Sequence, residues 1–164
     1  MSHFDSSRDI ETPPPPREGT LRVIPLGGVG EFGMNMMALE YGDDIIAIDC
    51  GVQFPGHELL GVDLVVPNVE YLESRLKNLR GLFLTHGHED HIGGLPYTIA
   101  KLKTPVYGTA LTLGLVRAKL REFDLETKTD LRQVAPRYRI QAGCFEVEFI
   151  SVTHSIPDAT CLAI

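Results

Sequence analysis

The order of apolar and polar positions predicts strands at the start of the chain and alternating helices and strands after about residue 70. Residues 21–26 form an apolar run that stops at Gly27-Gly28, which is typical of a strand. Residues 34–41 and 44–49 flank Gly42-Asp43, a turn signal that predicts a β-hairpin. Further strands are expected at 81–85, 105–107, 145–153 and 161–164, with one or two more in 133–141, and helices at 71–78, 96–103 and 109–124. This order predicts an α/β protein with a mixed sheet.

The amino-acid composition at both ends of the chain differs from that of its middle. Residues 1–19 contain Thr12 followed by four prolines, a composition that favours an extended, disordered tail. The ordered domain is therefore expected to span residues 20–164, with residues 52–68 as an aperiodic loop. The apolar segment 161–164 ends the chain without a turn, which indicates a fragment of a longer protein.

Composition and charge narrow the class of protein. No apolar run approaches the roughly 18 residues that a membrane helix needs, and no export signal is visible at the N-terminus. Cys50, Cys144 and Cys161 form no CxxC pair, so we expect reduced cysteines, buried in or beside strands, in a cytoplasmic protein. The net charge is −7, yet residues 75–139 carry twelve basic and six acidic residues. Solvated helix faces are the first interpretation of this basic region, although it could also meet a phosphate-bearing substrate.

Three histidines and two carboxylates fall between residues 86 and 91, directly after the apolar run 82–84. His86 and His88 are two residues apart, so in an extended segment both point the same way and can share one metal ion. Asp90 and His91 lie on the following turn and can face a second ion. Imidazole and carboxylate ligands suit zinc and manganese alike. The pattern indicates a metal-dependent site, with hydrolysis as its chemistry.

A second motif, GxGxxG at residues 28–33, points to a different fold. Together with Asp49 it has the spacing of a dinucleotide-binding fold. Only residues 34–41 remain for the required helix, and the histidine cluster would then have no explanation. We therefore interpret these glycines as a tight turn that needs positive φ angles or close backbone approach.

The motif HxHxDH after an apolar strand resembles the metallo-β-lactamase superfamily, and the surrounding residues resemble bacterial ribonuclease J in particular. The matching segments are PLGGVGEFGMNM at 25–36, IDCG at 48–51, LGVDLVVP at 60–67, residues 85–94, and VTHSIPDA at 152–159. The resemblance implies an αββα sandwich of which only the N-terminal portion is present. It also implies that the β-CASP domain and the C-terminal domain of this family are absent here.

The resemblance assigns the site residues. It implies that His86, His88 and His154 hold one metal ion, that Asp90 and His91 hold a second, and that Asp49 steadies the loop behind them. Asp90 and His88 are the expected catalytic residues. Asn35 and Ser155 are candidate substrate contacts. The family's bridging aspartate and last histidine ligand do not follow His154, so we expect this chain alone to bind one metal ion at best and to have little activity.

The implied activity is hydrolysis of phosphodiester bonds in single-stranded RNA, as a 5′-to-3′ exonuclease and an endonuclease. Two divalent ions, zinc first and manganese or magnesium as alternatives, would lie roughly 4 Å apart and activate a shared water. The family further implies a homodimer or homotetramer. Two other functions stay open: a hydrolase of the same fold that acts on thioesters, lactams or DNA, and a metal-binding paralogue without turnover.

Overall fold

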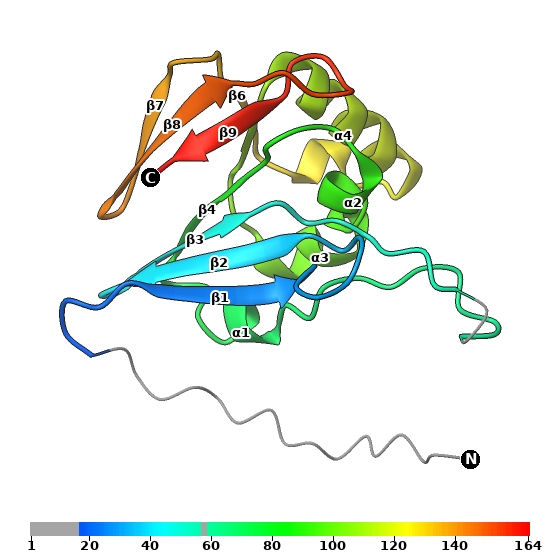
Figure 1. Cartoon of the computed structure of the whole chain (residues 1–164), viewed down its shortest axis with the longest axis horizontal. Coiled ribbons are helices and arrows are strands. Elements are labelled where there is room, and N and C mark those ends of the chain that lie inside the picture. Colours follow the sequence, from blue (N-terminus) through cyan, green and yellow to red (C-terminus); the bar gives the residue numbers. More distant parts are fainter. Residues whose placement is uncertain (1–16, 57–58) are drawn as a thin grey trace.

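The computed structural model describes residues 17–56 and 59–164 of the chain, and Figure 1 shows its course. The strands are β1 (Arg22–Gly27), β2 (Met36–Tyr41), β3 (Asp44–Ile48), β4 (Leu79–Phe83), β5 (Val106–Gly108), β6 (Leu131–Gln133), β7 (Arg139–Ala142), β8 (Phe145–Ser151) and β9 (Thr160–Ala163). The helices are α1 (Glu70–Glu73), α2 (Glu89–Ile92), α3 (Leu95–Leu102), α4 (Ala110–Glu122) and the 3-10 turn η1 (Glu126–Lys128). None of the described helices is long and apolar enough to cross a membrane.

Two sheets and one layer of helices form the fold. The larger sheet has the order β1-β2-β3-β4-β5-β6, antiparallel from β1 to β3 and parallel from β3 to β6. The smaller sheet, β7-β8-β9, is antiparallel and lies over one face of the larger sheet (Figure 1). The helices pack against the opposite face. The described residues thus provide three successive layers of the predicted sandwich: helices, sheet and sheet.

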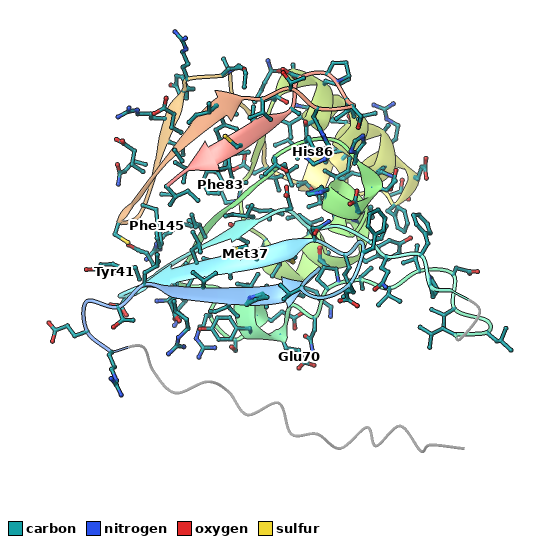
Figure 2. All side chains as sticks on the ribbon, in the orientation of Figure 1. Met37, Tyr41, Glu70, Phe83, His86 and Phe145 are labelled. Atoms are coloured by element: carbon teal, nitrogen blue, oxygen red, sulfur yellow. The ribbon has the colours of Figure 1, made fainter. Side chains whose placement is uncertain are left out.

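Alternating side chains on the central strands fill two separate cores. Ile45 and Leu82 enter the core beneath the helices, whereas their neighbours Ile46 and Phe83 enter the core between the sheets. Phe83 lies between the two sheets (Figure 2) and stacks on Tyr107, with ring centroids 4.8 Å apart. Because both faces of these strands are covered, they appear in the sequence as continuous apolar runs rather than as an alternating pattern.

Most predicted elements are confirmed, and the differences have physical causes. The predicted helix at 71–78 is wrong in its length, since α1 ends at Glu73 and turns follow to Asn78. The glycine turn leads into strand β2, which excludes the dinucleotide-binding fold. All three cysteines are free, but only Cys50 is buried; Cys144 and Cys161 are exposed, contrary to expectation. Of the tail predicted at residues 1–19, residues 1–16 lie outside the described residues, and residues 17–19 are exposed.

A buried carboxylate on β2 attaches helix α1 to the sheet. Glu40 is 5% exposed and accepts a hydrogen bond from the Tyr71 hydroxyl at 2.6 Å. Its carboxylate also pairs with Arg22 at 3.2 Å and with Arg75 at 3.8 Å. A buried carboxylate is tolerated only with such partners. Glu40 therefore connects β1, β2 and the α1 segment.

We predict that Glu40→Ala lowers the free energy of unfolding by about 2 kcal/mol, because it removes the acceptor of the part-buried Tyr71 hydroxyl and the carboxylate that Arg22 and Arg75 contact. Urea denaturation followed by circular dichroism measures this loss. The exposed Glu31 provides the matched control, and Glu31→Ala should change stability by less than about 0.5 kcal/mol. Equal stability of the two variants would contradict the assigned role of Glu40.

Candidate metal centre

The end of strand β4 begins the candidate metal centre. After β4 the chain follows a loop to His88, which is extended with φ −73° and ψ 152°, and then enters helix α2. His86 lies on the loop that links β4 to α2 (Figure 2). His154 arrives from the loop between β8 and β9. The site thus combines one loop from each sheet.

Three of the predicted ligands converge on one point. His86 Nε2 lies 3.1 Å from His88 Nδ1 and 3.2 Å from His154 Nε2, and one ring nitrogen from each of the three lies within 4.8 Å of the others. Burial, together with the nearby imidazole of His91, lowers the pKa of His86 to about 4, so this ring is neutral at pH 7. Three imidazole nitrogens in this arrangement fit a divalent ion such as zinc.

Asp90 and His91 lie together beside this trio. Asp90 Oδ2 is 3.5 Å from His91 Nε2, and the ring centroids of His91 and His86 are 4.0 Å apart. Within the described part of the chain, His86, His88 and His154 form the one group of three or more metal-ligand side chains. Asp90 and His91 are only two side chains, fewer than a closed metal site requires, and their role as ligands of a second ion stays a prediction.

The side chain of Asp49 fixes the histidine loop through hydrogen bonds to Thr85 and His91. Asp49 follows β3 in a left-handed conformation with φ 57°, is 5% exposed, and accepts hydrogen bonds from both the backbone N–H and the hydroxyl of Thr85 at 2.8 Å. Its Oδ2 also lies 2.7 Å from His91 Nδ1. Burial alone would lower the pKa of His91, but the hydrogen bond and charge of Asp49 outweigh it and raise that pKa. The same contact directs His91 Nε2 toward Asp90.

Asn35 and the loop after Asp49 fix the position of helix α2. The backbone N–H of Asn35 donates to the carbonyl oxygen of Asp90 at 2.9 Å, and its side-chain amide lies 3.1 Å from Asp90 Oδ2. Cys50 N–H donates to the carbonyl of His91 at 2.7 Å. Sequence reasoning proposed Asn35 as a substrate contact. That role stays a prediction, whereas its contact with Asp90 was not foreseen.

A carboxylate far along the chain positions the loop that carries His154. Asp158 Oδ2 accepts a hydrogen bond from the Leu111 N–H in the first turn of α4. Thr109 occupies the N-cap position as predicted, but its hydroxyl donates to the carbonyl of Asp158 and to Thr112 rather than capping the helix backbone. The side chain of Asp158 caps α4 instead. Ser155 is exposed, and its hydroxyl forms no hydrogen bond with another described residue.

The absence of a side chain at Gly51 permits the close packing of this site. A Cβ atom at Gly51 would lie 1.7 Å from the carbonyl oxygen of Asp90 and 2.8 Å from the backbone nitrogen of His91. Both are backbone atoms, so helix α2 would have to move. A side chain at Gly51 is therefore incompatible with the observed position of Asp90 and His91.

We predict that Gly51→Ala lowers the free energy of unfolding by at least about 2 kcal/mol, because it overpacks a closed backbone contact. Gly114→Ala is the control: Gly114 lies in α4, where an added Cβ atom would meet nothing within 4 Å, and alanine there should raise stability by about 0.5–1 kcal/mol. Urea denaturation of both variants measures the difference. A Gly51→Ala protein as stable as the parent would contradict the close approach.

Comparison with known proteins gives the class of the fold. The sequence profile of the metallo-β-lactamase superfamily matches residues 29–154, a range that includes all five predicted metal ligands. The solved metallo-β-lactamase SMB-1, in complex with mercaptoacetic acid, aligns with a TM-score of 0.58 and 18% identity over 90% of this chain and 58% of its own. The chain belongs to the metallo-β-lactamase superfamily, and the predicted fold class is confirmed.

Within this superfamily the chain is similar to ribonuclease J. It is 45% identical to ribonuclease J2 of Bacillus subtilis over 139 residues, which cover 85% of this chain and 25% of that protein. It is 44% identical to ribonuclease J of Mycolicibacterium smegmatis over 160 residues, which cover 96% of this chain and 28% of that protein. The chain spans about a quarter of the length of these relatives. The resemblance predicted from the sequence motifs is confirmed.

Proposed function

We propose that this chain provides the metal-binding part of a ribonuclease J-type enzyme, which hydrolyses single-stranded RNA as an exonuclease and an endonuclease. The observation that carries the proposal is the convergence of His86, His88 and His154 from two separate loops. Similarity to proteins named ribonuclease J over most of the chain supports RNA as the substrate class. A cytoplasmic location and a dimeric or tetrameric assembly belong to the same proposal.

His86, His88 and His154 would hold one divalent ion, zinc or manganese, and Asp90 with His91 would contribute to a second. Bound ions would supply positive charge for the scissile phosphodiester and acidify a water molecule. The neutral state of His86 leaves its ring nitrogen available as a ligand without loss of a proton. The Asp49 carboxylate accepts a hydrogen bond from His91 Nδ1, and this keeps the other ring nitrogen, Nε2, directed toward Asp90.

In this proposal Asp90 would handle the proton of the attacking water. Its side chain is 30% exposed, so solvent reaches it, while Asn35 fixes the Oδ2 atom by a contact at 3.1 Å. A carboxylate held in this way can orient the water for in-line attack and accept its proton. His88 would contribute to the reaction as a metal ligand. Ser155 is exposed next to His154 and is free to contact a phosphate group.

We predict one tight zinc site per chain, because the described residues form one cluster of three ligands. His88→Ala should weaken zinc binding more than about 100-fold, since it removes a direct ligand and not only an outer partner. His91→Ala, which lies outside the trio, should retain the tight site. Isothermal titration calorimetry of the parent and both variants tests this. Two tight sites in the parent chain, or an intact site in His88→Ala, would contradict the assignment.

The proposed activity is tested on 5′-monophosphorylated single-stranded RNA, with the whole protein that contains this chain and added zinc or manganese. His88→Ala should reduce the rate at least about 1,000-fold, because it disrupts the site that activates water. Lys77→Ala, an exposed substitution outside the site, should leave the rate unchanged. Cleavage of a lactam, a thioester or DNA in place of RNA would replace the proposed substrate. No turnover of any of them would indicate a metal-binding paralogue.

A further inference from the structure

A cavity of about 400 Å³ lies on the helix-covered side of the larger sheet, between the end of α3, the start of β5 and the turn η1. Its apolar lining comes mainly from Ile99, Pro105 and Leu125. The volume falls within the range of about 300–1,000 Å³ that is usual for small-molecule sites. This cavity is large enough for a ligand with an apolar or aromatic group.

The cavity lies away from the candidate metal centre. Thr104 and Pro105 directly precede β5, and Asp130 directly precedes β6, whereas the histidine loop follows the carboxyl end of β4. Strands β4, β5 and β6 are parallel. The cavity therefore lies at the amino ends of these parallel strands and the histidine loop at their carboxyl ends, and no predicted metal ligand lines the cavity.

Two lysines give this cavity a positive rim. Lys103 and Lys128 both line it, are exposed, and form no ion pair with any other described residue. The one carboxylate in the lining, Asp130, accepts two hydrogen bonds from Arg132 at 3.0 and 2.7 Å, which offset its charge. The two ammonium groups thus remain available to an anion.

A buried hydroxyl adds a third polar group. Thr104 lines the cavity and is 5% exposed, and its Oγ1 has no hydrogen-bond partner among the described residues. Buried polar atoms are paired in the great majority of cases, so an unpaired one requires a partner. Rotation about the Cα–Cβ bond of Thr104 moves its hydroxyl to another staggered position, from which it can point into the cavity.

We propose that this cavity binds a small phosphate monoester that carries an apolar or aromatic group, such as a nucleoside monophosphate. A phosphate monoester has a charge of about −1.5 to −2 at neutral pH, which matches the two free ammonium groups. Lys103 and Lys128 bind the phosphate oxygens from two different elements, and Thr104 donates to one of them. The apolar lining formed by Ile99, Pro105 and Leu125 packs against the apolar or aromatic group of the ligand.

The test uses AMP as the probe and the metal-free chain in the presence of a chelator, so that its outcome does not depend on the proposed metal site. AMP should shift the backbone amide resonances of residues 99–105 and 125–130 in ¹⁵N-correlated NMR spectra. Adenosine, which lacks the phosphate, should bind at least about tenfold more weakly. Equal binding of AMP and adenosine, or AMP shifts confined to residues around His86 and His154, would overturn the proposal.

Substitutions in the cavity provide the second measurement. Lys103→Ala and Lys128→Ala should each weaken AMP binding about fivefold, as expected for partly exposed charge-assisted contacts. Thr104→Val should also weaken it while leaving the fold intact, because it replaces an unpaired hydroxyl by a methyl group of similar size. Lys77→Ala is the control and should bind AMP like the parent. Unchanged AMP affinity in both lysine variants would exclude the site.

A further arm distinguishes two sources of the phosphate group. A short 5′-phosphorylated RNA and its unphosphorylated counterpart are compared with AMP at the same resonances. Preference for AMP identifies a free mononucleotide as the ligand type. Preference for the phosphorylated RNA, with about fivefold weaker binding to Lys128→Ala, identifies the 5′ end of an RNA as the ligand. The phosphate monoester is the recognised group in both cases.

Discussion

The buried carboxylate of Asp49 is the interaction on which the geometry of the candidate metal centre depends. It joins the end of β3 to the loop after β4 through Thr85, and to helix α2 through His91. A carboxylate at this depth is stable only while its acceptor sites are filled, so none of these contacts can be lost without a cost of about 1–3 kcal/mol. The left-handed backbone at Asp49, which aspartate tolerates better than most residues, then turns the chain toward Gly51.

The two-sheet arrangement brings the distant ligand to this point. His154 is 68 residues after His86 in the sequence, yet their Nε2 atoms are 3.2 Å apart. Thr160, at the start of β9, donates both its backbone N–H and its hydroxyl to the carbonyl of Thr85 at 2.9 Å. Asp158 anchors the same loop on helix α4. The smaller sheet is therefore part of the site, because it fixes where His154 enters.

The features that the sequence predicts well are those with local causes. The hairpin β2-β3 follows from a Gly-Asp turn between apolar runs. His86 and His88 of the HxHxDH motif lie close together because they are only two residues apart in the sequence. The features that it misses depend on partners far away in the chain. Asp158 caps a helix that begins 48 residues earlier, and α1 is held by Glu40 on β2 rather than by its own helical propensity. The exposure of Cys161 likewise depends on which face of β9 packs against the larger sheet.

The change from extended to helical backbone at His88 explains why the side chains of one short motif point to two different positions. His88 itself is extended, and the side chains of His86 and His88, two residues apart, meet His154. From Glu89 onward the chain is helical, and each residue turns by about 100° relative to the last. Asp90 and His91 therefore face the neighbouring position, while Glu89 turns away and pairs with Lys119 on α4. A helix beginning one residue earlier would remove His88 from the trio, so the start of α2, fixed by the contacts of Asn35 and Cys50, decides which side chains converge with His154.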